Sequence, residues 1–255
     1  DGAVTAGHRA LADEIERIAR ADTLLVCLDF DGTICELGPD AYAVTPNPEA
    51  LRAARTLMAL PGTQVAVLSG RHLEGLRRVV GLEKPVVLVG SHGAETTAGA
   101  PQLAPADRAY LDDIARQLEA IATPPAFVES KPYQRVIHVA ALAETDPELA
   151  EDILARARAL ATPGRPLLSG HNVVEFSAIE VTKGSWLREH KKDFAATLFA
   201  GDDTTDETAL RALGPADLGI KVGPKPTVAT HRVAGVDEMA QVLTRLAEAR
   251  RQSAL

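Results

Sequence analysis

The stretch that decides the fold is Leu24 to Ile34, with the sequence LLVCLDFDGTI. Its first five residues are apolar, as in a strand buried on both faces, and an aspartate pair follows directly. Side chains alternate along a strand, so Asp29 and Asp31 are expected on one face while Phe30 turns into the interior. Two carboxylates this close repel each other unless a positive group lies between them, and a divalent cation with oxygen ligands is the usual solution.

The aspartate pair can divide catalytic work between its two carboxylates. One can attack an electrophile, while the other donates and accepts protons. Gly32 permits a sharp turn after the strand, and Thr33 can offer its hydroxyl and amide to an anion. The same residue types also occur in ordinary turns after buried strands, so this stretch does not establish a catalytic site by itself.

The composition is that of an ordinary globular protein, with 255 residues, 46% hydrophobic and 24% charged. This length suits a core with a smaller second domain. The net charge of −8 argues against a nucleic-acid partner, and no apolar run reaches the ~20 residues of a membrane span. Cys27 and Cys35, without a recognisable leader, favour a reducing, cytoplasmic location. No Cys/His cluster indicates zinc.

Around the first strand, predicted helices alternate with further buried strands at Gln64 to Leu68 and Val86 to Val89. This alternation predicts an α/β fold with a Rossmann-like parallel sheet covered on both faces. Ligands of such sheets bind at the carboxyl ends of the strands, which is where Asp29, Ser69 and His92 stand.

The pattern changes after Thr96, where residues 97–107 have the Ala, Gly, Pro and Thr content of a linker. Strands are then predicted at Phe127 to Lys131, Arg135 to Ala140, Leu167 to Ser169 and Val173 to Phe176, with helices at Ala106 to Ile121 and Pro147 to Leu160. Short links between neighbouring strands predict a small α+β domain with a mainly antiparallel sheet. We therefore expect a core domain of residues 1–97 and 179–255, with an inserted α+β cap domain of residues 98–178.

The core resumes at Lys183, with strands predicted at Thr197 to Ala200 and, as the last strand, at Leu218 to Val222. Here and at Ser69, three more groups could complete a phosphate site. Ser69 opens a helix and places a hydroxyl and free amides around an anion, and Lys183 can bridge a nucleophile and a phosphoryl oxygen. The acidic run GDDTTDE at 201–207 can supply a metal ligand and a carboxylate that orients the lysine. Taken singly, Ser69 could be a helix cap, Lys183 a surface lysine and the acidic run the start of a helix. The prediction of a phosphate site therefore depends on all three occurring together.

Together these motifs resemble the haloacid dehalogenase superfamily, whose first motif is DxDGT after an apolar strand. The resemblance implies that Asp29 is the nucleophile and Asp31 the general acid and base. It implies that Ser69 and Lys183 are catalytic residues that bind the phosphate. The resemblance further implies that Thr33, Gly70 and Arg71 bind the phosphate. It implies a Mg²⁺ ion held by Asp29, Asp202 and the backbone carbonyl of Asp31. Asp203 and Asp206 are implied as supporting residues of this site, with Asp206 holding Lys183 in position.

A closer resemblance, to trehalose-6-phosphate phosphatases, covers nearly the whole chain. It includes LSGR at 68–71, GSHGAE at 90–95, VESK at 128–131, VVEF at 173–176 and GDDTTDE at 201–207. It implies that Glu129, Lys131 and Glu175 bind sugar hydroxyls, with His92 and His138 as further substrate contacts. The expected partner is a small-molecule sugar phosphate, bound by a monomer without nucleic-acid or membrane partners.

We therefore predict a Mg²⁺-dependent phosphatase that hydrolyses trehalose 6-phosphate through an aspartyl-phosphate intermediate. Two departures keep other substrates open: His138-Val139-Ala140 stands where the family has His-Tyr-Arg, and Glu175-Phe176-Ser177-Ala178 where it has Glu-x-Arg-Pro. The alternatives are a phosphatase of another sugar phosphate (sucrose phosphate, a glycosylglycerate phosphate or a pseudo-disaccharide phosphate) and a phosphosugar mutase. A degenerate binding domain is a third, although such a domain has no physical need for two adjacent unpaired carboxylates.

Overall fold

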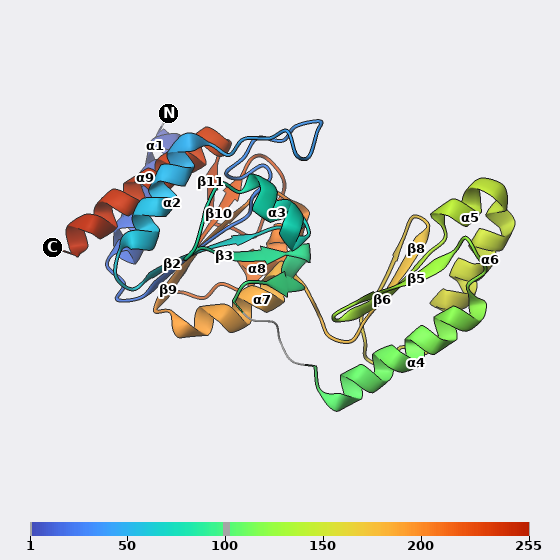
Figure 1. Ribbon diagram of the computed structural model, residues 1–255. Coiled ribbons are helices and arrows are strands. Elements are labelled where there is room, and N and C mark those ends of the chain that lie inside the picture. The colour runs from blue at the N-terminus through green and yellow to red at the C-terminus, as the bar shows by residue number, and fades with distance from the viewer. Residues whose placement is uncertain (1, 99–102, 255) are drawn as a thin grey trace. The chain divides into compact units, whose positions relative to one another are not determined.

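The computed structural model describes residues 2–98 and 103–254, with side chains from residue 10 onward. Residues 99–102 of the expected linker lie outside the described residues. The chain divides into two compact units (Figure 1). The core unit comprises Asp1–Ala100 and Thr182–Leu255, and the second unit comprises Pro101–Val181.

The core unit is built on a seven-stranded sheet with the order β11-β10-β9-β1-β2-β3-β4. Its strands are β1 (Leu24–Leu28), β2 (Thr63–Leu68), β3 (Val87–Gly90), β4 (Glu95–Thr96), β9 (Ala196–Gly201), β10 (Leu218–Val222) and β11 (His231–Val233). Neighbouring strands are parallel except β3 and β4, which are antiparallel. Because β1 lies between β9 and β2, the aspartates that follow it emerge in the middle of the carboxyl edge.

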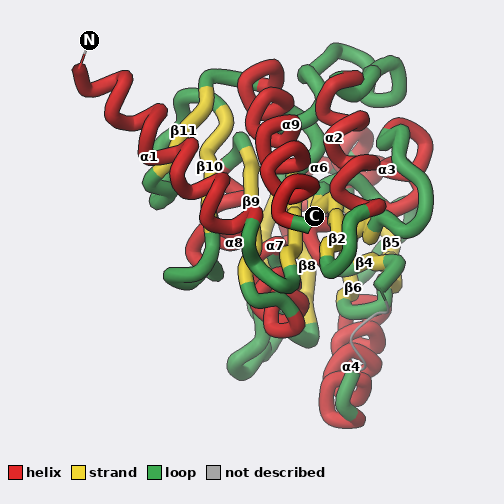
Figure 2. Tube along the Cα trace, turned by 90° about the vertical axis from the view of Figure 1, so that its left-hand side faces the viewer, coloured by secondary structure: helices red, strands yellow, loops and turns green. Residues whose placement is uncertain are grey.

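Helices cover both faces of this sheet (Figures 1 and 2). One face packs against α1 (Gly2–Ala19), α2 (Pro48–Ala59), α3 (Leu73–Val79) and α9 (Val236–Ser253), and the other against α7 (Lys183–His190) and α8 (Glu207–Arg211). The side chains of β1 alternate accordingly, with Leu24, Val26 and Leu28 in one apolar cluster and Leu25 and Cys27 in the other. This two-sided burial explains the continuous apolar run and confirms the predicted α/β core.

The second unit is an antiparallel sheet with helices against one face. Its strands are β5 (Phe127–Lys131), β6 (Gln134–His138), β7 (Leu167–Gly170) and β8 (Val173–Ser177), in the order β5-β6-β8-β7. Helices α4 (Pro105–Ile121) and α6 (Pro147–Arg158) pack against this sheet, and α5 (Ala140–Thr145) lies beside α6 (Figure 1). The separate antiparallel sheet confirms the predicted α+β fold of the insertion.

Several short elements differ from those predicted; in particular, the helix expected to open at Ser69 begins at Leu73, after the N-cap His72. The strand expected at Arg135 to Ala140 ends at His138, because Val139 leaves the extended conformation (φ −121°, ψ 8°) and α5 begins after it. The expectation that Leu218 to Val222 is the last strand is wrong, since β11 follows it. Neither β11 nor β4 was predicted, because two or three residues are too few to show a periodic pattern.

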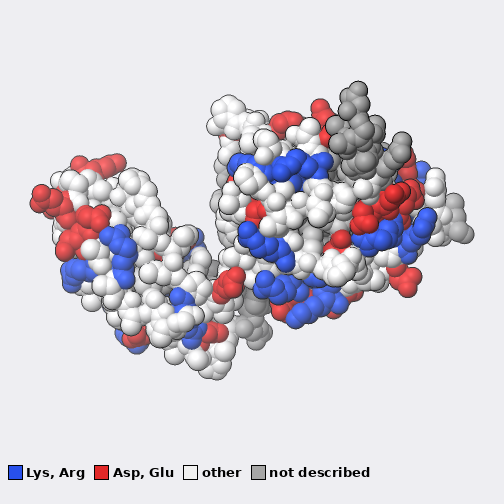
Figure 3. Space-filling view, turned by 180° about the vertical axis from the view of Figure 1, so that it is seen from behind, with Lys and Arg blue, Asp and Glu red and all other residues white. Residues whose placement is uncertain are grey.

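The surface of the described chain carries both signs of charge. On the face shown in Figure 3, Lys and Arg side chains form separate groups over the core unit, with acidic side chains among them. Among the described helices, none combines the length and the apolar character needed to cross a bilayer.

Candidate active site

Three aspartates come together at the carboxyl edge of the core sheet. Asp29 follows β1, and Asp202 follows β9, the parallel neighbour of β1. Asp206 ends a short 3-10 helix, Thr204–Asp206, that precedes α8. Their carboxylates offer oxygens that all lie within 4.8 Å of one another. Two adjacent strand ends and one short helix therefore gather three acidic groups in one cluster.

The carboxylate of Asp29 is buried, with 4% of the residue exposed, and both of its oxygens accept a hydrogen bond. Lys183 Nζ donates to Oδ1 at 2.9 Å, and the Thr33 hydroxyl donates to Oδ2 at 3.0 Å. Burial, opposed by the charge of Lys183 and reinforced by Asp202, raises the pKa of Asp29 to about 7. The group is thus fixed in orientation and stripped of most water, as a carboxylate nucleophile requires.

Lys183 links this aspartate to the acidic loop. It lies in the first turn of α7, is 3% exposed, and donates to Asp206 Oδ1 at 2.8 Å as well as to Asp29. Burial lowers the pKa of Lys183, but the charges of Asp29 and Asp206 outweigh that effect, so the pKa lies above its ordinary value. Burial, followed by the charge of Asp29, raises the pKa of Asp206 to about 6. Lys183 therefore stays positively charged between the two carboxylates.

Two motif glycines allow the loops to approach this closely. Gly32 has a φ of 80°, in the left-handed region, and a Cβ atom there would overlap the carboxylate of Asp202. A Cβ atom on Gly70 would lie 2.5 Å from the His92 ring. These positions explain why the loops after β1 and β2 contain glycine.

Asp31 makes different contacts from those of Asp29. Its carboxylate accepts two hydrogen bonds of 2.8 Å from Arg71, from Nε to Oδ2 and from Nη2 to Oδ1. The carboxylates gathered in one cluster are therefore those of Asp29, Asp202 and Asp206, while that of Asp31 turns to Arg71. Coordination of a metal by the backbone carbonyl of Asp31 stays a prediction.

Other core residues singled out from the sequence lie at neighbouring strand ends. Ser69 follows β2 and is 1% exposed, and its hydroxyl oxygen accepts a hydrogen bond from the Arg71 amide at 3.0 Å. His92 follows β3, and its amide donates to the Ser69 carbonyl at 2.9 Å. Asp203 lies outside the carboxylate cluster. Lys225 Nζ donates to its carboxylate at 2.6 Å, and this hydrogen bond lowers the pKa of Asp203.

The acidic cluster has the chemistry of a site for a hard divalent cation. Its donors are carboxylate oxygens from Asp29, Asp202 and Asp206. Burial raises the pKa of all three carboxyl groups, and a cation between them would favour their ionised forms. Structural zinc is held mainly by sulfur and nitrogen ligands, whereas Mg²⁺ prefers oxygen ligands. This oxygen-only donor set therefore suits Mg²⁺ better than zinc.

A buried ion pair beneath the acidic loop was not predicted. Lys221 in β10, 0% exposed, donates from Nζ to Glu207 Oε2 and to the Asp203 carbonyl, both at 3.0 Å. Glu207 also accepts the Val228 amide at 2.7 Å and the Thr227 hydroxyl at 3.1 Å. The available signal was a lysine inside an apolar strand of a sheet covered on both faces, where a charge needs a partner.

In the second unit, the residues expected to bind sugar share one face of the sheet. Glu129 and Lys131 lie on β5, His138 on β6 and Glu175 on β8, and the register sets Val136 between Glu129 and Glu175. His138 Nε2 lies 2.9 Å from Glu129 Oε1, and Lys131 Nζ lies 3.5 Å from Glu175 Oε1. The alternate side chains of these strands join the apolar core formed with α4 and α6. The charged face is therefore the face opposite these helices.

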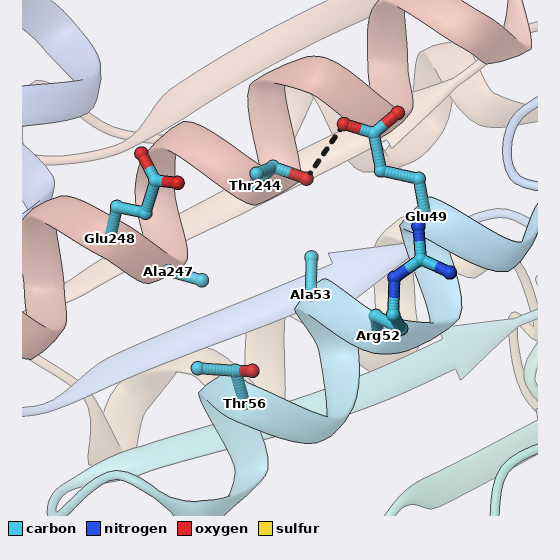
Figure 4. A pocket seen from close by; sticks show the side chains of 7 residues that line it. All are labelled: Glu49, Arg52, Ala53, Thr56, Thr244, Ala247 and Glu248. Atoms are coloured by element: carbon cyan, nitrogen blue, oxygen red, sulfur yellow. Dashed lines mark hydrogen bonds between the residues drawn. The ribbon is translucent and has the colours of Figure 1, made fainter.

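A separate pocket of about 240 Å³ lies between α2 and α9 of the core unit (Figure 4). It is lined by Glu49, Arg52, Ala53, Thr56, Thr244, Ala247 and Glu248. The Thr244 hydroxyl donates to Glu49 Oε1 at 3.0 Å. The lining contains none of the residues singled out from the sequence, so this pocket is distinct from the predicted site.

Comparisons with known proteins point to one family. The family model described as trehalose-phosphatase matches residues 27–241. The bifunctional trehalose-6-phosphate synthase/phosphatase of Thermoproteus tenax is 34% identical over 240 residues, which cover 89% of this chain and 32% of that protein. The trehalose-phosphate phosphatase of Mycobacterium marinum is 32% identical over 273 residues, which cover 96% of this chain and 68% of that protein. The chain thus spans about a third of the first relative and about two thirds of the second.

Among solved structures, the fold is similar to that of Aspergillus fumigatus trehalose-6-phosphate phosphatase. The TM-score is 0.72 at 21% identity, and the match covers 93% of this chain and 97% of that one. At this identity the comparison concerns the fold, which is of the predicted haloacid dehalogenase type. Asp29, Lys183 and Asp206 all fall inside the residues that the family model matches.

Proposed function

The chain belongs to the trehalose-phosphatase family, and on this premise we propose that it hydrolyses trehalose 6-phosphate to trehalose and inorganic phosphate. The observation that carries the proposal is the contact of buried Lys183 with both Asp29 and Asp206. A fixed carboxylate with a permanent cation beside it suits attack on a phosphate monoester, whose negative charge must be neutralised before a nucleophile can approach.

In the proposed reaction, a carboxylate oxygen of Asp29 bonds to phosphorus, and the bond between phosphorus and the sugar oxygen breaks. Asp31 gives its proton to that leaving oxygen. Asp31 then takes a proton from water as the water oxygen bonds to phosphorus, and the bond to Asp29 breaks to release phosphate. Lys183 and the Ser69 hydroxyl hold the phosphoryl oxygens throughout, and the Thr33 hydroxyl joins them when it turns from Asp29 to the phosphate.

The same proposal assigns a divalent cation to the acidic cluster. Asp29, Asp202 and the backbone carbonyl of Asp31 would hold it, with Asp206 keeping Lys183 in place. When bound, the cation supplies positive charge that draws the phosphate toward the nucleophile. We favour Mg²⁺ because the donors are oxygens and because Mg²⁺ commonly binds through carboxylates and substrate phosphates together.

Arg71 connects phosphate recognition to proton transfer in this scheme. Each oxygen of Asp31 accepts a hydrogen bond from its guanidinium, so the two side chains hold each other in place. The phosphate of an incoming substrate offers the guanidinium a stronger anionic partner. Transfer of Arg71 to the phosphate would therefore release Asp31 for its work.

The sugar part of the substrate is assigned to the second unit, acting as a cap, and to His92. Carboxylates accept hydrogen bonds from sugar hydroxyls, and an ammonium group donates to them, which suits Glu129, Glu175 and Lys131. A second candidate function is hydrolysis of another disaccharide phosphate. It is favoured by the absence of the family's arginine near Glu175, where Ser177 instead accepts a hydrogen bond from Gln134 at 3.0 Å.

Phosphate release across a panel of purified sugar phosphates tests the proposal. Trehalose 6-phosphate should give the highest kcat/KM, with sucrose 6-phosphate and glucose 6-phosphate well below it. Asp29→Asn protein, purified identically, controls for contaminating phosphatases. Chelation should stop the reaction and added Mg²⁺ should restore it, and full activity after exhaustive chelation would remove the metal from the scheme. A clear preference for another disaccharide phosphate would transfer the proposal to that substrate.

The cellular setting and the assembly state belong to the same proposal. Cys27 and Cys35 are free and buried, as expected of thiols that are kept reduced in a cytoplasmic environment. The reaction scheme uses residues of a single chain, which supports a monomer. Size-exclusion chromatography with light scattering checks the monomer directly.

A further inference from the structure

The face of the second unit that carries the expected sugar-binding residues also carries an exposed aromatic ring. Phe127, the first residue of β5, is 55% exposed, whereas Phe30, Phe176 and Phe199 are 0% exposed. Its ring stacks on that of His138, with centroids 4.8 Å apart and planes 16° from parallel. Exposure of the Phe127 ring forgoes the free energy that burial of an apolar side chain provides, so its exposed position suggests a role in binding.

The stack determines which side of the ring is open. His138 lies directly opposite Phe127 in the register of β5 with β6, so its imidazole covers the side of the ring that faces β6. Strand β5 is an edge strand whose one neighbour in the described sheet is β6. The other side of the Phe127 ring therefore faces outward from the sheet edge, in a fixed orientation.

Polar groups continue the same line along the strand. Glu129 and Lys131 follow Phe127 at two-residue steps and so share its face of the sheet. Same-face positions are about 7 Å apart, so the three groups line a strip about 14 Å long. The side chains of Glu129 and Lys131 are 42% and 39% exposed. The strip thus presents an apolar ring, an acceptor and a donor in order.

This order matches the chemistry of a sugar. A pyranose ring with mostly equatorial hydroxyls has apolar faces of C–H bonds, which pack on the electron-rich face of an aromatic ring. Its rim of hydroxyls both donates and accepts hydrogen bonds, which suits a carboxylate and an ammonium group beside the ring. A strip of this length gives room for two linked rings.

We propose that Phe127 is a specificity-determining residue, on whose open side a pyranose ring of the substrate stacks beside Glu129 and Lys131. The inference rests on the proposed function and deepens it by adding an aromatic platform to the sugar-binding residues already assigned. His138 is a positioning residue, since it stacks on Phe127 and contacts Glu129.

The competing explanation is a structural one, because cross-strand aromatic pairs stabilise sheets without any ligand. The two explanations differ in what the ring must be. A stabilising pair needs an apolar neighbour for His138, whereas a sugar platform needs a flat aromatic face. Variants that change flatness separately from apolar bulk therefore distinguish them.

The test compares Phe127→Tyr, Phe127→Leu and Phe127→Ala in the full chain. Leu168→Ala is the matched control, because Leu168 is 64% exposed on the same face but lies on β7 at the opposite edge. Each protein is assayed for kcat/KM on trehalose 6-phosphate and on acetyl phosphate, which has no ring, and for its melting temperature. We expect Phe127→Ala and Phe127→Leu to lower kcat/KM for the sugar phosphate roughly fivefold to tenfold, mainly through KM. Phe127→Tyr, Leu168→Ala and all rates on acetyl phosphate should stay within about twofold of wild type.

Full activity of Phe127→Leu on the sugar phosphate, or equal losses on both substrates together with a lower melting temperature, would overturn the inference. The proposed function can fail separately. Suppose that wild type does not hydrolyse trehalose 6-phosphate but that Phe127→Leu selectively slows hydrolysis of another pyranose phosphate. The role of Phe127 would then be supported, and trehalose 6-phosphate would be excluded as the substrate. Hydrolysis of acetyl phosphate without hydrolysis of any pyranose phosphate would overturn both.

Discussion

Arg71 holds the carboxylate of Asp31 through two hydrogen bonds of 2.8 Å, although the two residues come from loops that follow different strands. Arg71 Nη1 also donates to the Ala41 carbonyl at 2.5 Å, and the guanidinium carbon lies 5.5 Å from the centroid of the Phe30 ring. The guanidinium is thus positioned from several sides. In the proposed reaction, its exchange between carboxylate and phosphate decides when Asp31 can transfer protons.

We expect Arg71→Lys to lower kcat/KM for trehalose 6-phosphate about 10- to 100-fold, because an ammonium group cannot reproduce the two-point contact with a carboxylate or a phosphate. The loss should be smaller on an aryl phosphate, whose leaving group needs little protonation. Arg78→Ala is the control, since Arg78 lies on the helix that follows Arg71 in the chain, α3, and its guanidinium carbon lies 3.9 Å from the centroid of the Tyr42 ring. Equal losses on both substrates would show that Arg71 does not act through Asp31.

Alanine at Glu129, Lys131 or Glu175 should lower kcat/KM for trehalose 6-phosphate by about 10- to 150-fold, since each lost hydrogen bond to a charged group is worth ~1.5–3 kcal/mol. Hydrolysis of a small aryl phosphate should change little, because it lacks the sugar hydroxyls. Glu151→Ala, which removes an exposed carboxylate from α6 of the same unit, is the control. Proportional losses on both substrates would mean that these residues support the fold of the cap.

Lys221→Met should lower the free energy of unfolding by about 3–5 kcal/mol, because it leaves Glu207 buried without its cation. Urea denaturation of the purified protein measures this change. The double variant Lys221→Met with Glu207→Gln should recover part of the loss, since the uncompensated charge is gone. A double variant as unstable as the sum of the two single variants would show that the pair is not coupled.

The stability of the protein should depend on pH through His190. Burial lowers the pKa of His190 and the charge of Asp193 opposes this shift, so the folded state favours the neutral imidazole. As the pH falls below the ordinary value of 6.5, the unfolded chain binds the proton first. The stability from this site is therefore complete above that value and is lost as the pH falls toward the lower pKa of the folded state.

Trp186 allows this effect to be measured, because it is the single tryptophan of the chain and stacks on His190 at 4.4 Å between centroids. Thermal melting followed by its fluorescence, in wild type and in His190→Gln, should show the largest difference in melting temperature at pH 8. The difference should narrow as the pH is lowered to 5. A difference that does not vary with pH would exclude titration of His190 as the cause.

The core fold could be predicted because its central strands are buried on both faces. The apolar runs of β1, β2 and β9 stand out for that reason, and chemically distinctive residues follow each of them. Asp29 and Asp202 meet because β1 pairs in parallel with β9, and parallel pairing brings the carboxyl ends of both strands to one edge of the sheet. The same reasoning could not find β4 or β11, whose few residues carry no period.

Side-chain partners were harder to predict than strands. The sequence placed Arg71 among phosphate ligands, but its pairing with Asp31 depends on the paths of two loops, which no local pattern encodes. Phe127 was predicted only as part of a strand, because alternation predicts a face and not which residues on that face stay exposed. The ion pair of Lys221 with Glu207 likewise joins β10 to α8 through the fold alone.

The most direct test of the proposed reaction is phosphate release from trehalose 6-phosphate by wild type and by Asp29→Asn in the presence of Mg²⁺. The asparagine is nearly isosteric, so the variant should keep the melting behaviour of wild type while losing its nucleophile. We predict that wild type releases one phosphate per trehalose formed and that Asp29→Asn is at least about a thousandfold slower, which corresponds to ~4 kcal/mol of barrier. A folded Asp29→Asn protein with more than about a thousandth of wild-type activity would contradict the assignment of Asp29 as the nucleophile.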